Sequence, residues 1–266
     1  MKKLLKSALA SLAIAGAMTT GALAAGGGNV KQADIDFPFE GPFGVYDRAA
    51  LQRGLQVYQN SCSGCHGMKY VAFRSLSEEN GPGMSPEQVK AFIAEAGYEV
   101  EDENGELVPA KTYDYFPEVK DAGAPDMSLL AKARPNGPTH IYSILTGFAD
   151  PPECAPEDFD GNYNIAFGSG GIPDECKDEA GKSTIVGSWI AMGQPLYGDD
   201  VEYADGREAS LENEAADVAQ FLMWAAEPTL VERKQAGVRN ILFLIIFAVM
   251  LYFVKQRIWG RVKHPE

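Results

Sequence analysis

Apolar side chains recur at helical spacing in the stretch that follows Asp47. Asp47 is a favourable helix N-cap because its carboxylate can accept a free backbone N–H. Leu51, Leu55 and Tyr58 follow at intervals that place them on one face of a helix, which we interpret as a core-facing stripe. Gly54 lies beside this face and has no side chain, so another helix can cross closely there.

A second stretch with the same pattern lies in residues 210–228. Ser210 is a favourable N-cap, and Pro228 ends or kinks the helix. Between them runs an apolar stripe that comprises Leu211, Ala215, Val218, Phe221, Leu222 and Ala225. We predict that this helix crosses the first one at Gly54 and closes the fold.

Residues 70–123 carry weaker patterns and are predicted to be peripheral. A short helix is expected over residues 85–95, because Ser85 is a good cap and a proline follows in the first turn. Residues 98–108 are predicted to form a hairpin, and the Asn104-Gly105 pair is typical of a type I′ turn.

An uninterrupted apolar run occupies residues 241–254. The run alone is shorter than the roughly 20 residues of a membrane span, so a buried core helix is the competing interpretation. Tyr252 and Trp259 lie where an aromatic belt forms at a membrane surface. Long basic side chains that can snorkel flank the run, namely Arg239, Lys255, Arg257, Arg261 and Lys263. We therefore predict one C-terminal transmembrane helix at about residues 237–258.

The first residues have the pattern of a secretory signal peptide. Lysines precede a short apolar stretch that ends in an Ala-x-Ala cleavage pattern at residues 22–24; a retained membrane helix is the alternative. We predict a signal peptide over residues 1–24, an exported domain over 25–227, and a membrane anchor over 228–266. Basic residues after the apolar run place the C-terminus in the cytoplasm of a bacterium and the larger domain in the periplasm.

The predicted exported domain is strongly acidic. The whole chain has a formal net charge of −14, and residues 25–227 hold 13 basic and 35 acidic residues, which gives −22. Such a field attracts a basic soluble partner, an effect that salt weakens; plain solubility explains the charge equally well. Nothing in the sequence indicates nucleic-acid binding.

The most specific chemical signal is the sequence Cys-Ser-Gly-Cys-His at residues 62–66. Two thiols at this spacing, followed at once by an imidazole, are typical of haem attached through two thioether bonds. Cys62 and Cys65 are then the attachment points, and His66 is an axial iron ligand. Half of a zinc site and a thioredoxin-like pair are the alternatives, but the immediately following histidine and the predicted export favour haem.

Two further cysteines lie between residues 150 and 183, where glycine and proline are dense and periodicity disappears. In an exported protein, Cys154 and Cys176 are expected to form a disulfide that staples this long loop. A four-cysteine zinc site that includes Cys62 and Cys65 is the alternative.

The second axial ligand is less clear from the residues alone. Of the three histidines, His66 is in the motif and His264 follows the predicted anchor, so His140 is the one histidine candidate for the second axial position. The methionines that remain possible are Met84, Met127 and Met192. Met192 lies in a loop-like segment from which a thioether can project, but methionine is also a common core filler, so spacing leaves the choice open.

Several motifs taken together resemble the cytochrome c1 family. They are the residues 53–58 that precede the haem motif, Ala124-Pro125-Asp126, Ala133-Arg134, the Met192 loop, residues 221–228 and the single C-terminal anchor. The resemblance covers nearly the whole predicted mature chain. Together these motifs are far more specific than the haem motif alone.

The resemblance implies a mainly α, class I cytochrome c-like haem domain with inserted loops, and one covalently bound haem c. His66 and Met192 would be the axial ligands, Arg134 would contact a haem propionate, and Pro125 would line the haem pocket. The Cys154–Cys176 pair resembles a disulfide of several bacterial members. In two places this chain departs from many relatives: Gly193-Gln194 precedes Pro195, and His140 stands where relatives often have tyrosine.

The implied function is electron transfer within a quinol-oxidising cytochrome bc1 complex. The haem would accept one electron from a Rieske iron-sulfur protein and pass it to a soluble or membrane-anchored cytochrome c, while cytochrome b and membrane lipid surround the anchor. The family also implies a dimeric complex. The alternatives are an independent membrane-anchored cytochrome c that serves a terminal oxidase, and a zinc-stapled extracellular interaction module.

Overall fold

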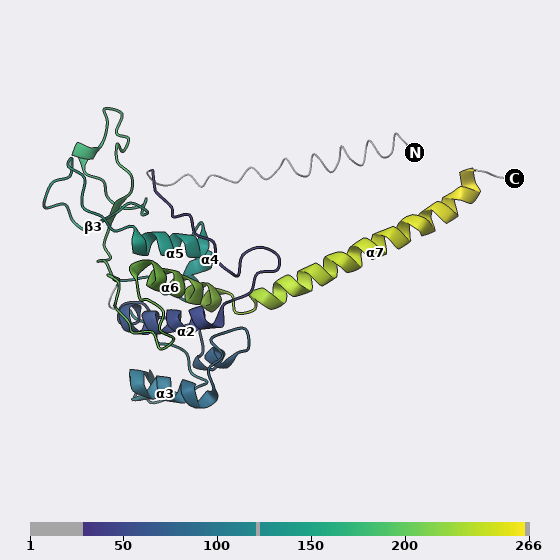
Figure 1. The fold of residues 1–266 in the computed structure, drawn as a ribbon, viewed down its shortest axis with the longest axis horizontal. Helices are drawn as coiled ribbons and strands as arrows, with labels where there is room; N and C mark the ends of the chain where they lie inside the picture. The colour runs from purple at the N-terminus through teal and green to yellow at the C-terminus, as the bar shows by residue number, and fades with distance from the viewer. Residues whose placement is uncertain (1–28, 121–122, 264–266) are drawn as a thin grey trace.

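The computed structural model describes residues 29–120 and 123–263, and this part of the chain is mainly helical (Figure 1). The predicted signal peptide, residues 1–24, lies outside the described residues. The α-helices are α2 (Arg48–Val57), α3 (Pro86–Ala96), α4 (Leu130–Ala133), α5 (Gly137–Thr146), α6 (Leu211–Ala226) and α7 (Leu230–Lys263). Two short antiparallel pairs join β1 (Glu99–Glu101) to β2 (Leu107–Pro109) and β3 (Asn162–Asn164) to β4 (Ser188–Ile190). The predicted fold class is confirmed.

Helix α6 lies between α2 and α5 and also contacts α4 (Figure 1). The crossing with α2 is very close at Gly54, because a Cβ added there would lie 2.1 Å from the carbonyl oxygen of Asp217 and 2.6 Å from Cβ of Phe221. Ordinary van der Waals contact begins at 3.4 Å, so the crossing accepts only glycine. The prediction that these two helices cross at Gly54 is confirmed.

A buried ion pair lies beside this crossing. The Arg53 side chain donates from Nε and Nη2 to the two carboxylate oxygens of Asp217, at 2.7 and 3.1 Å, and from Nη1 to Asp205 at 2.6 Å. The hydrogen bond to Asp217 raises the pKa of Arg53. Removing one partner of such a buried pair costs about 3–5 kcal/mol, since the other charge is left uncompensated. The pair therefore fixes how α2 and α6 sit against each other.

The helices begin where the sequence predicts. The side chains of Asp47, Ser85 and Ser210 accept backbone N–H groups at the start of α2, α3 and α6, and Ser85 completes a capping box with Gln88. Each cap satisfies a donor that the helix itself leaves free. Pro228 lies between α6 and α7, as expected for a residue that cannot continue a helix.

The hairpin of β1 and β2 is confirmed, but its predicted type I′ turn is wrong. That turn needs a positive φ at both central residues, whereas here Gly105 has a φ of 80° and Asn104 is not among the described residues with positive φ. The Asp102 carboxylate accepts the N–H groups of Asn104 and Glu106 at 2.8 and 2.9 Å, which lowers the pKa of Asp102. These side chain to backbone bonds stabilise a longer loop.

The prediction that residues 70–123 are peripheral is wrong for some of their aromatic side chains, although three tyrosines of the segment are exposed. Phe73 and Phe116 are fully buried, with ring centroids 4.3 Å apart, and Tyr98 meets Phe116 edge-on at 5.5 Å. Tyr58, at the end of α2, lies 6.0 Å from the Phe116 ring. The segment thus contributes aromatic side chains to the core beside Tyr58. The irregular spacing of these residues along the chain did not predict this packing.

The long loop after α5 is connected at several points to the rest of the domain. It contains a disulfide between Cys154 and Cys176, and the Cys176 side chain is fully buried. The disulfide leaves neither cysteine for a four-cysteine zinc site. Buried Asn164 on β3 donates from Nδ2 to the carbonyl of Ile144 on α5 at 2.8 Å. The loop is therefore an ordered insertion that ends in β4.

Helix α7 extends from the globular part as a long single helix (Figure 1). It contains 34 residues, more than the predicted 237–258, and residues 230–260 are long and apolar enough to cross a membrane. At the expected rise per residue it is about 50 Å long, which exceeds the hydrocarbon core of a bilayer. At its start, Glu227 forms ion pairs with Lys132 and Arg233, and Tyr46 donates to the Glu227 carbonyl at 2.9 Å.

Candidate functional site

A five-residue π-helical turn, Tyr58–Cys62, carries the chain from α2 into the cysteine motif. Ser63 N–H donates to the Tyr58 carbonyl at 2.8 Å, and Cys65 and His66 N–H groups both donate to the Cys62 carbonyl, at 3.1 and 2.9 Å. Such wide turns recur at functional sites because they redirect side chains at the end of a regular helix. Here the turn folds the cysteine pair and the histidine into one compact loop.

The two thiols of the motif are available for covalent attachment. Cys62 and Cys65 are free cysteines in the structure; Cys62 is buried and Cys65 is exposed. Burial raises the pKa of the Cys62 thiol to about 12, with a smaller contribution from Cys65. Neither thiol is engaged in a disulfide, so both cysteines can form the thioether bonds that the motif predicts.

The imidazole of His66 is buried and held in one orientation. Its Nδ1 lies 2.8 Å from the carbonyl oxygen of Pro125. Because a carbonyl only accepts, Nδ1 carries the proton, which leaves the lone pair on Nε2 free for a metal. The Tyr58 hydroxyl donates to the His66 carbonyl at 2.7 Å and fixes the backbone as well. A hydrogen bond of this kind from Nδ1 is the usual support of a metal-binding histidine.

The segment that contains Pro125 is itself fastened to the backbone after His66. Asp126 accepts from the N–H groups of Lys69 and Ser128, at 3.0 and 2.9 Å. Met127 N–H donates to the Gly67 carbonyl at 2.8 Å. A Cβ on Gly67 would lie 2.4 Å from the carbonyl oxygen of Pro117, so the chain passes very close to its neighbour here. These contacts determine where the Pro125 carbonyl meets the imidazole.

Met192, the sequence candidate for the opposite ligand, lies two residues after β4 and is half-buried. β4 is anchored before it: the buried Trp189 ring packs against Phe159 and Tyr163 at centroid distances of 5.0 and 4.9 Å. Leu196 is fully buried after it. Met192 therefore sits in a short loop that is fixed at both ends, and Gly193 has open space around it.

The remaining ligand candidates lie elsewhere. Met127 is buried and is bonded through its backbone to Gly67, next to His66, and Met84 packs against the core at the start of α3. His140 is half-buried on α5, where burial and the nearby positive charge of Arg134 lower its pKa. Arg134 is exposed, just after α4. The positive charge of Arg134 acts on His140, and the Pro125 carbonyl contacts the imidazole of His66.

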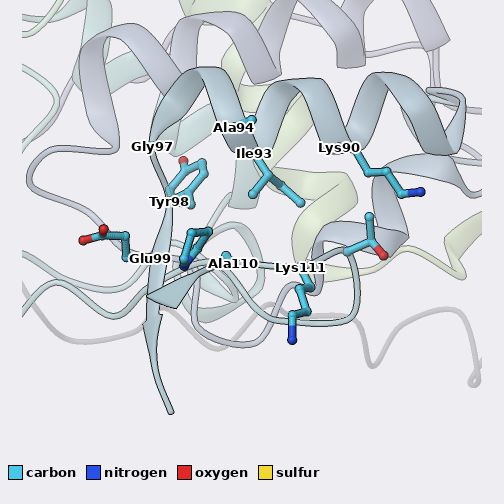
Figure 2. Close-up of a pocket in the computed structure, with 10 residues that line it drawn as sticks. Lys90, Ile93, Ala94, Gly97, Tyr98, Glu99, Ala110 and Lys111 are labelled. Atoms are coloured by element: carbon cyan, nitrogen blue, oxygen red, sulfur yellow. The ribbon is translucent and has the colours of Figure 1, made fainter. Parts of the chain in front are cut away.

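A separate groove lies between α3 and the β1–β2 hairpin (Figure 2). Figure 2 shows Ile93, Tyr98 and Ala110 in its wall and Lys90 and Lys111 at its edge. None of the predicted haem residues lines this groove. The groove is therefore not part of the haem site.

Sequence reasoning missed several residues that support the site. The hydroxyl of Tyr58 and the Asp126 carboxylate each hold a backbone group close to His66, and Asn164 joins β3, the partner strand of β4, to α5. Only Asp126 had a readable signal, since Asp with Ser128 two residues later is typical of an Asx turn. The partners of Tyr58 and Asn164 lie on other elements, so no local pattern could identify them.

Comparison with known proteins finds relatives along nearly the full length of this chain. A family model described as the cytochrome C1 family matches residues 37–262. A cytochrome c1 of Cereibacter sphaeroides is 46% identical over 285 residues, which cover 99% of this chain and 97% of that protein. A cytochrome c1 of Rhodobacter capsulatus is 43% identical over 282 residues, with 99% of each chain covered. A cytochrome b/c1 of Bradyrhizobium diazoefficiens is 36% identical over 283 residues, which cover 97% of this chain and 40% of that longer protein.

The fold, the cysteine motif and the long apolar helix define the class of the protein as a membrane-anchored c-type cytochrome. The chain belongs to the cytochrome c1 family. Members of this family carry covalently bound haem c, so the predicted cofactor is confirmed, and the free thiols and the oriented imidazole fit it. The predicted resemblance to this family is also confirmed.

Proposed function

We propose that this chain is the haem-bearing electron-transfer subunit of a cytochrome bc1 complex, which oxidises quinol and reduces a cytochrome c. Similarity over the full length to cytochrome c1 proteins is the observation that carries the proposal. Quinol oxidation belongs to partner subunits, and this chain relays one electron outward without binding quinol. One longer relative is named cytochrome b/c1, so a single chain carries both names. This relative supports a partnership with cytochrome b.

Four residues would hold the haem. Cys62 and Cys65 would form the thioether bonds, and His66 Nε2 and the Met192 sulfur would bind the iron from opposite sides. The orientation of His66 by the Pro125 carbonyl supports the first axial assignment. The position of Met192 in a loop fixed at both ends supports the second, and Met127 is the weaker candidate because its backbone is bonded to Gly67, next to His66.

Haem c, when bound, supplies a one-electron couple, and ligation by both histidine and methionine raises its potential. The chain's own residues set the conditions for this couple. His66 and Cys62 are buried whereas Cys65 is exposed, so the attachment side is shielded from water only in part. We assign Arg134 to a haem propionate, and its neighbour His140 would share the same electrostatic environment.

The domain organisation follows from the sequence patterns and from the long apolar helix. Residues 1–24 would be a signal peptide, residues 25–227 a periplasmic haem domain, and residues 228–266 an anchor in the inner membrane. Within the residues that the structure describes, one long apolar helix supports a single span. Basic residues beyond it favour a cytoplasmic C-terminus.

The partners of the haem domain would be a Rieske iron-sulfur protein as donor and a cytochrome c with a basic face as acceptor. The charge of −22 on residues 25–227 supports an acidic docking surface for a basic partner. We further expect the complex to be dimeric and to include membrane lipid around the anchor.

Purification from membranes through an affinity tag on this chain tests the proposal. We expect an alkaline pyridine spectrum of c-type haem, together with a b-type cytochrome and a Rieske protein in stoichiometric amounts. A chain that carries c-type haem but purifies alone would favour the independent electron shuttle. A spectrum without c-type haem would contradict the proposal altogether.

A further inference from the structure

A groove lies where the loop before α2 passes the start of α7 (Figure 1). Residues 42–45 form one wall and α7 forms the other, and the groove volume of about 610 Å³ is within the ordinary range of ligand sites. The α7 residues that line it recur every three or four positions, so they share one face of the helix. They include Val231, Lys234, Val238, Leu242 and Ile246. The groove therefore runs along the helix from the globular part into the apolar run.

The loop that forms the first wall is fixed to its surroundings. The N–H of Val45 donates to the Pro38 carbonyl at 3.2 Å. A Cβ on Gly44 would lie 2.0 Å from a backbone carbonyl oxygen of the same turn, so the turn is tight. Lys234 Nζ donates to the Phe39 carbonyl and joins the loop to α7. The loop and the helix are thus held against each other, and the groove between them is preformed.

Large apolar side chains of both walls are exposed. Phe43 is 79% exposed and Val45 is 52% exposed on the loop. On α7, Leu242 and Phe243 are 56% and 63% exposed. Contiguous apolar surface of this kind marks a site of interaction with a membrane or with another apolar partner. It continues directly into the part of α7 that is apolar enough to cross a membrane.

Two basic residues lie in the groove at the level of lipid headgroups. Arg239 and Lys234 come two and seven residues before Ile241, where the apolar run begins, which is about 3 and 10 Å along the helix. The headgroup layer extends about 5–8 Å from the hydrocarbon boundary, and long basic side chains can reach into it. The ion pair at this end of α7 joins Arg233 to Glu227. Within the described residues, neither Lys234 nor Arg239 has a carboxylate partner.

We propose that this groove is a binding site for one anionic phospholipid of the surrounding membrane. The phosphate binds Lys234 and Arg239, because ammonium and guanidinium groups form charge-assisted hydrogen bonds with phosphate oxygens. One acyl chain follows Leu242 and Ile246 into the bilayer, and Phe43 covers its glycerol end. The apolar continuation of the groove favours a lipid over a soluble anion, which has no chain to place there. The proposal rests on α7 spanning a membrane, which the proposed function also requires, and adds a specific lipid site to it.

Photolabelling of the intact complex tests the proposal. The complex is reconstituted in vesicles of equal parts phosphatidylglycerol and phosphatidylcholine, and a trace of one of the two lipids carries a diazirine on its acyl chain. Mass spectrometry measures the label on residues 242–246 relative to residues 247–254, the rest of the apolar run. Each basic residue near a membrane surface favours an anionic lipid about fivefold. Label from phosphatidylglycerol should therefore exceed label from phosphatidylcholine at residues 242–246 by at least about fivefold.

Arg239→Gln is the main variant, because Arg239 is exposed and makes no side-chain hydrogen bond to a described residue. It should lower the preference for phosphatidylglycerol about fivefold, and Arg239→Lys should keep the preference. Arg257→Gln is the matched control, since Arg257 is an exposed arginine of the same helix beyond the apolar run. The control should leave the preference at residues 242–246 unchanged. Phe43→Ala should lower the label from both lipids there, because the groove loses part of its wall.

Equal label from the two lipids would overturn the proposal, as would an Arg239→Gln complex that is labelled like the native one. Unchanged label in the Phe43→Ala complex would also overturn it, since it would indicate an ordinary lipid layer around a bare helix. Label on residues 247–254 without label on residues 242–246 would mean that another subunit fills the groove, against the proposal. Absence of label along the whole of α7 would refute the anchor and the lipid site together. None of these readouts depends on haem or on co-purified subunits, so a failure of the electron-transfer role is detected separately.

Discussion

Replacing Gly54 by alanine tests the packing that brings α2 and α6 together. The added Cβ would lie 2.1 Å from the Asp217 carbonyl oxygen, against the 3.4 Å of ordinary contact, and the nearest groups are backbone and the Cβ of Phe221. Neither can rotate away, so α6 must move by about 1 Å. The movement also strains the hydrogen bonds between Arg53 and Asp217.

Overpacking of this kind costs about 1–3 kcal/mol, and disturbance of the buried ion pair adds to it. Alanine recovers about 1 kcal/mol through its better helix propensity. We therefore expect a net loss of about 2 kcal/mol, which lowers the apparent Tm of the haem domain by about 4–8 °C. Thermal scans at one fixed rate, followed by the haem absorbance, measure this shift.

Gly237→Ala is the matched control for Gly54→Ala. It is also a helical glycine, but a Cβ at Gly237 meets nothing within 4 Å. The control should not lower the apparent Tm, because alanine there improves helix propensity without meeting a neighbour. An equal Tm for the Gly54→Ala protein and the native protein would refute the close crossing of α2 and α6 as described.

Three further predictions concern the site and its surface. Asp126→Ala should lower the stability of the haem domain by about 1–3 kcal/mol in thermal scans, since two backbone N–H groups lose their acceptor; Asp126→Asn should lose less. Replacing Cys154 and Cys176 together by serine should cost about 3 kcal/mol by the same measurement, given their separation of 22 residues. Turnover with a basic cytochrome c should slow as ionic strength rises, and a rate independent of salt would leave the acidic charge as a solubility feature.

The sequence predicted the parts of the fold that local patterns encode. The caps at Asp47, Ser85 and Ser210 and the stripes behind them correctly located α2, α3 and α6. The crossing at Gly54 was predictable because a helical glycine beside an apolar stripe has a simple packing explanation. The predicted type of the turn after β1 was wrong because the Asp102 side chain decides the backbone conformation. Asp102 lies outside the Asn104-Gly105 pair on which the prediction was based.

The site itself was predictable only in part. The spacing of Cys62, Cys65 and His66 is a local signal, whereas the contact between His66 and the Pro125 carbonyl joins segments far apart in the chain. No sequence pattern indicated that Glu214 is buried. A glutamate in the first turn of a helix normally lies at the surface, where its negative charge interacts favourably with the helix dipole. Its burial depends on residues 197–201 folding over it.

The reduction potential of a Met192→Leu variant tests the central claim most directly. Leucine keeps the apolar volume but offers no sulfur to the iron, so the covalent haem should be retained while the potential falls by a large margin. Met127→Leu is the control and should leave the potential near that of the native protein, since the backbone of Met127 is bonded to Gly67, next to His66. An unchanged potential in the Met192→Leu complex would contradict ligation of this haem by His66 and Met192.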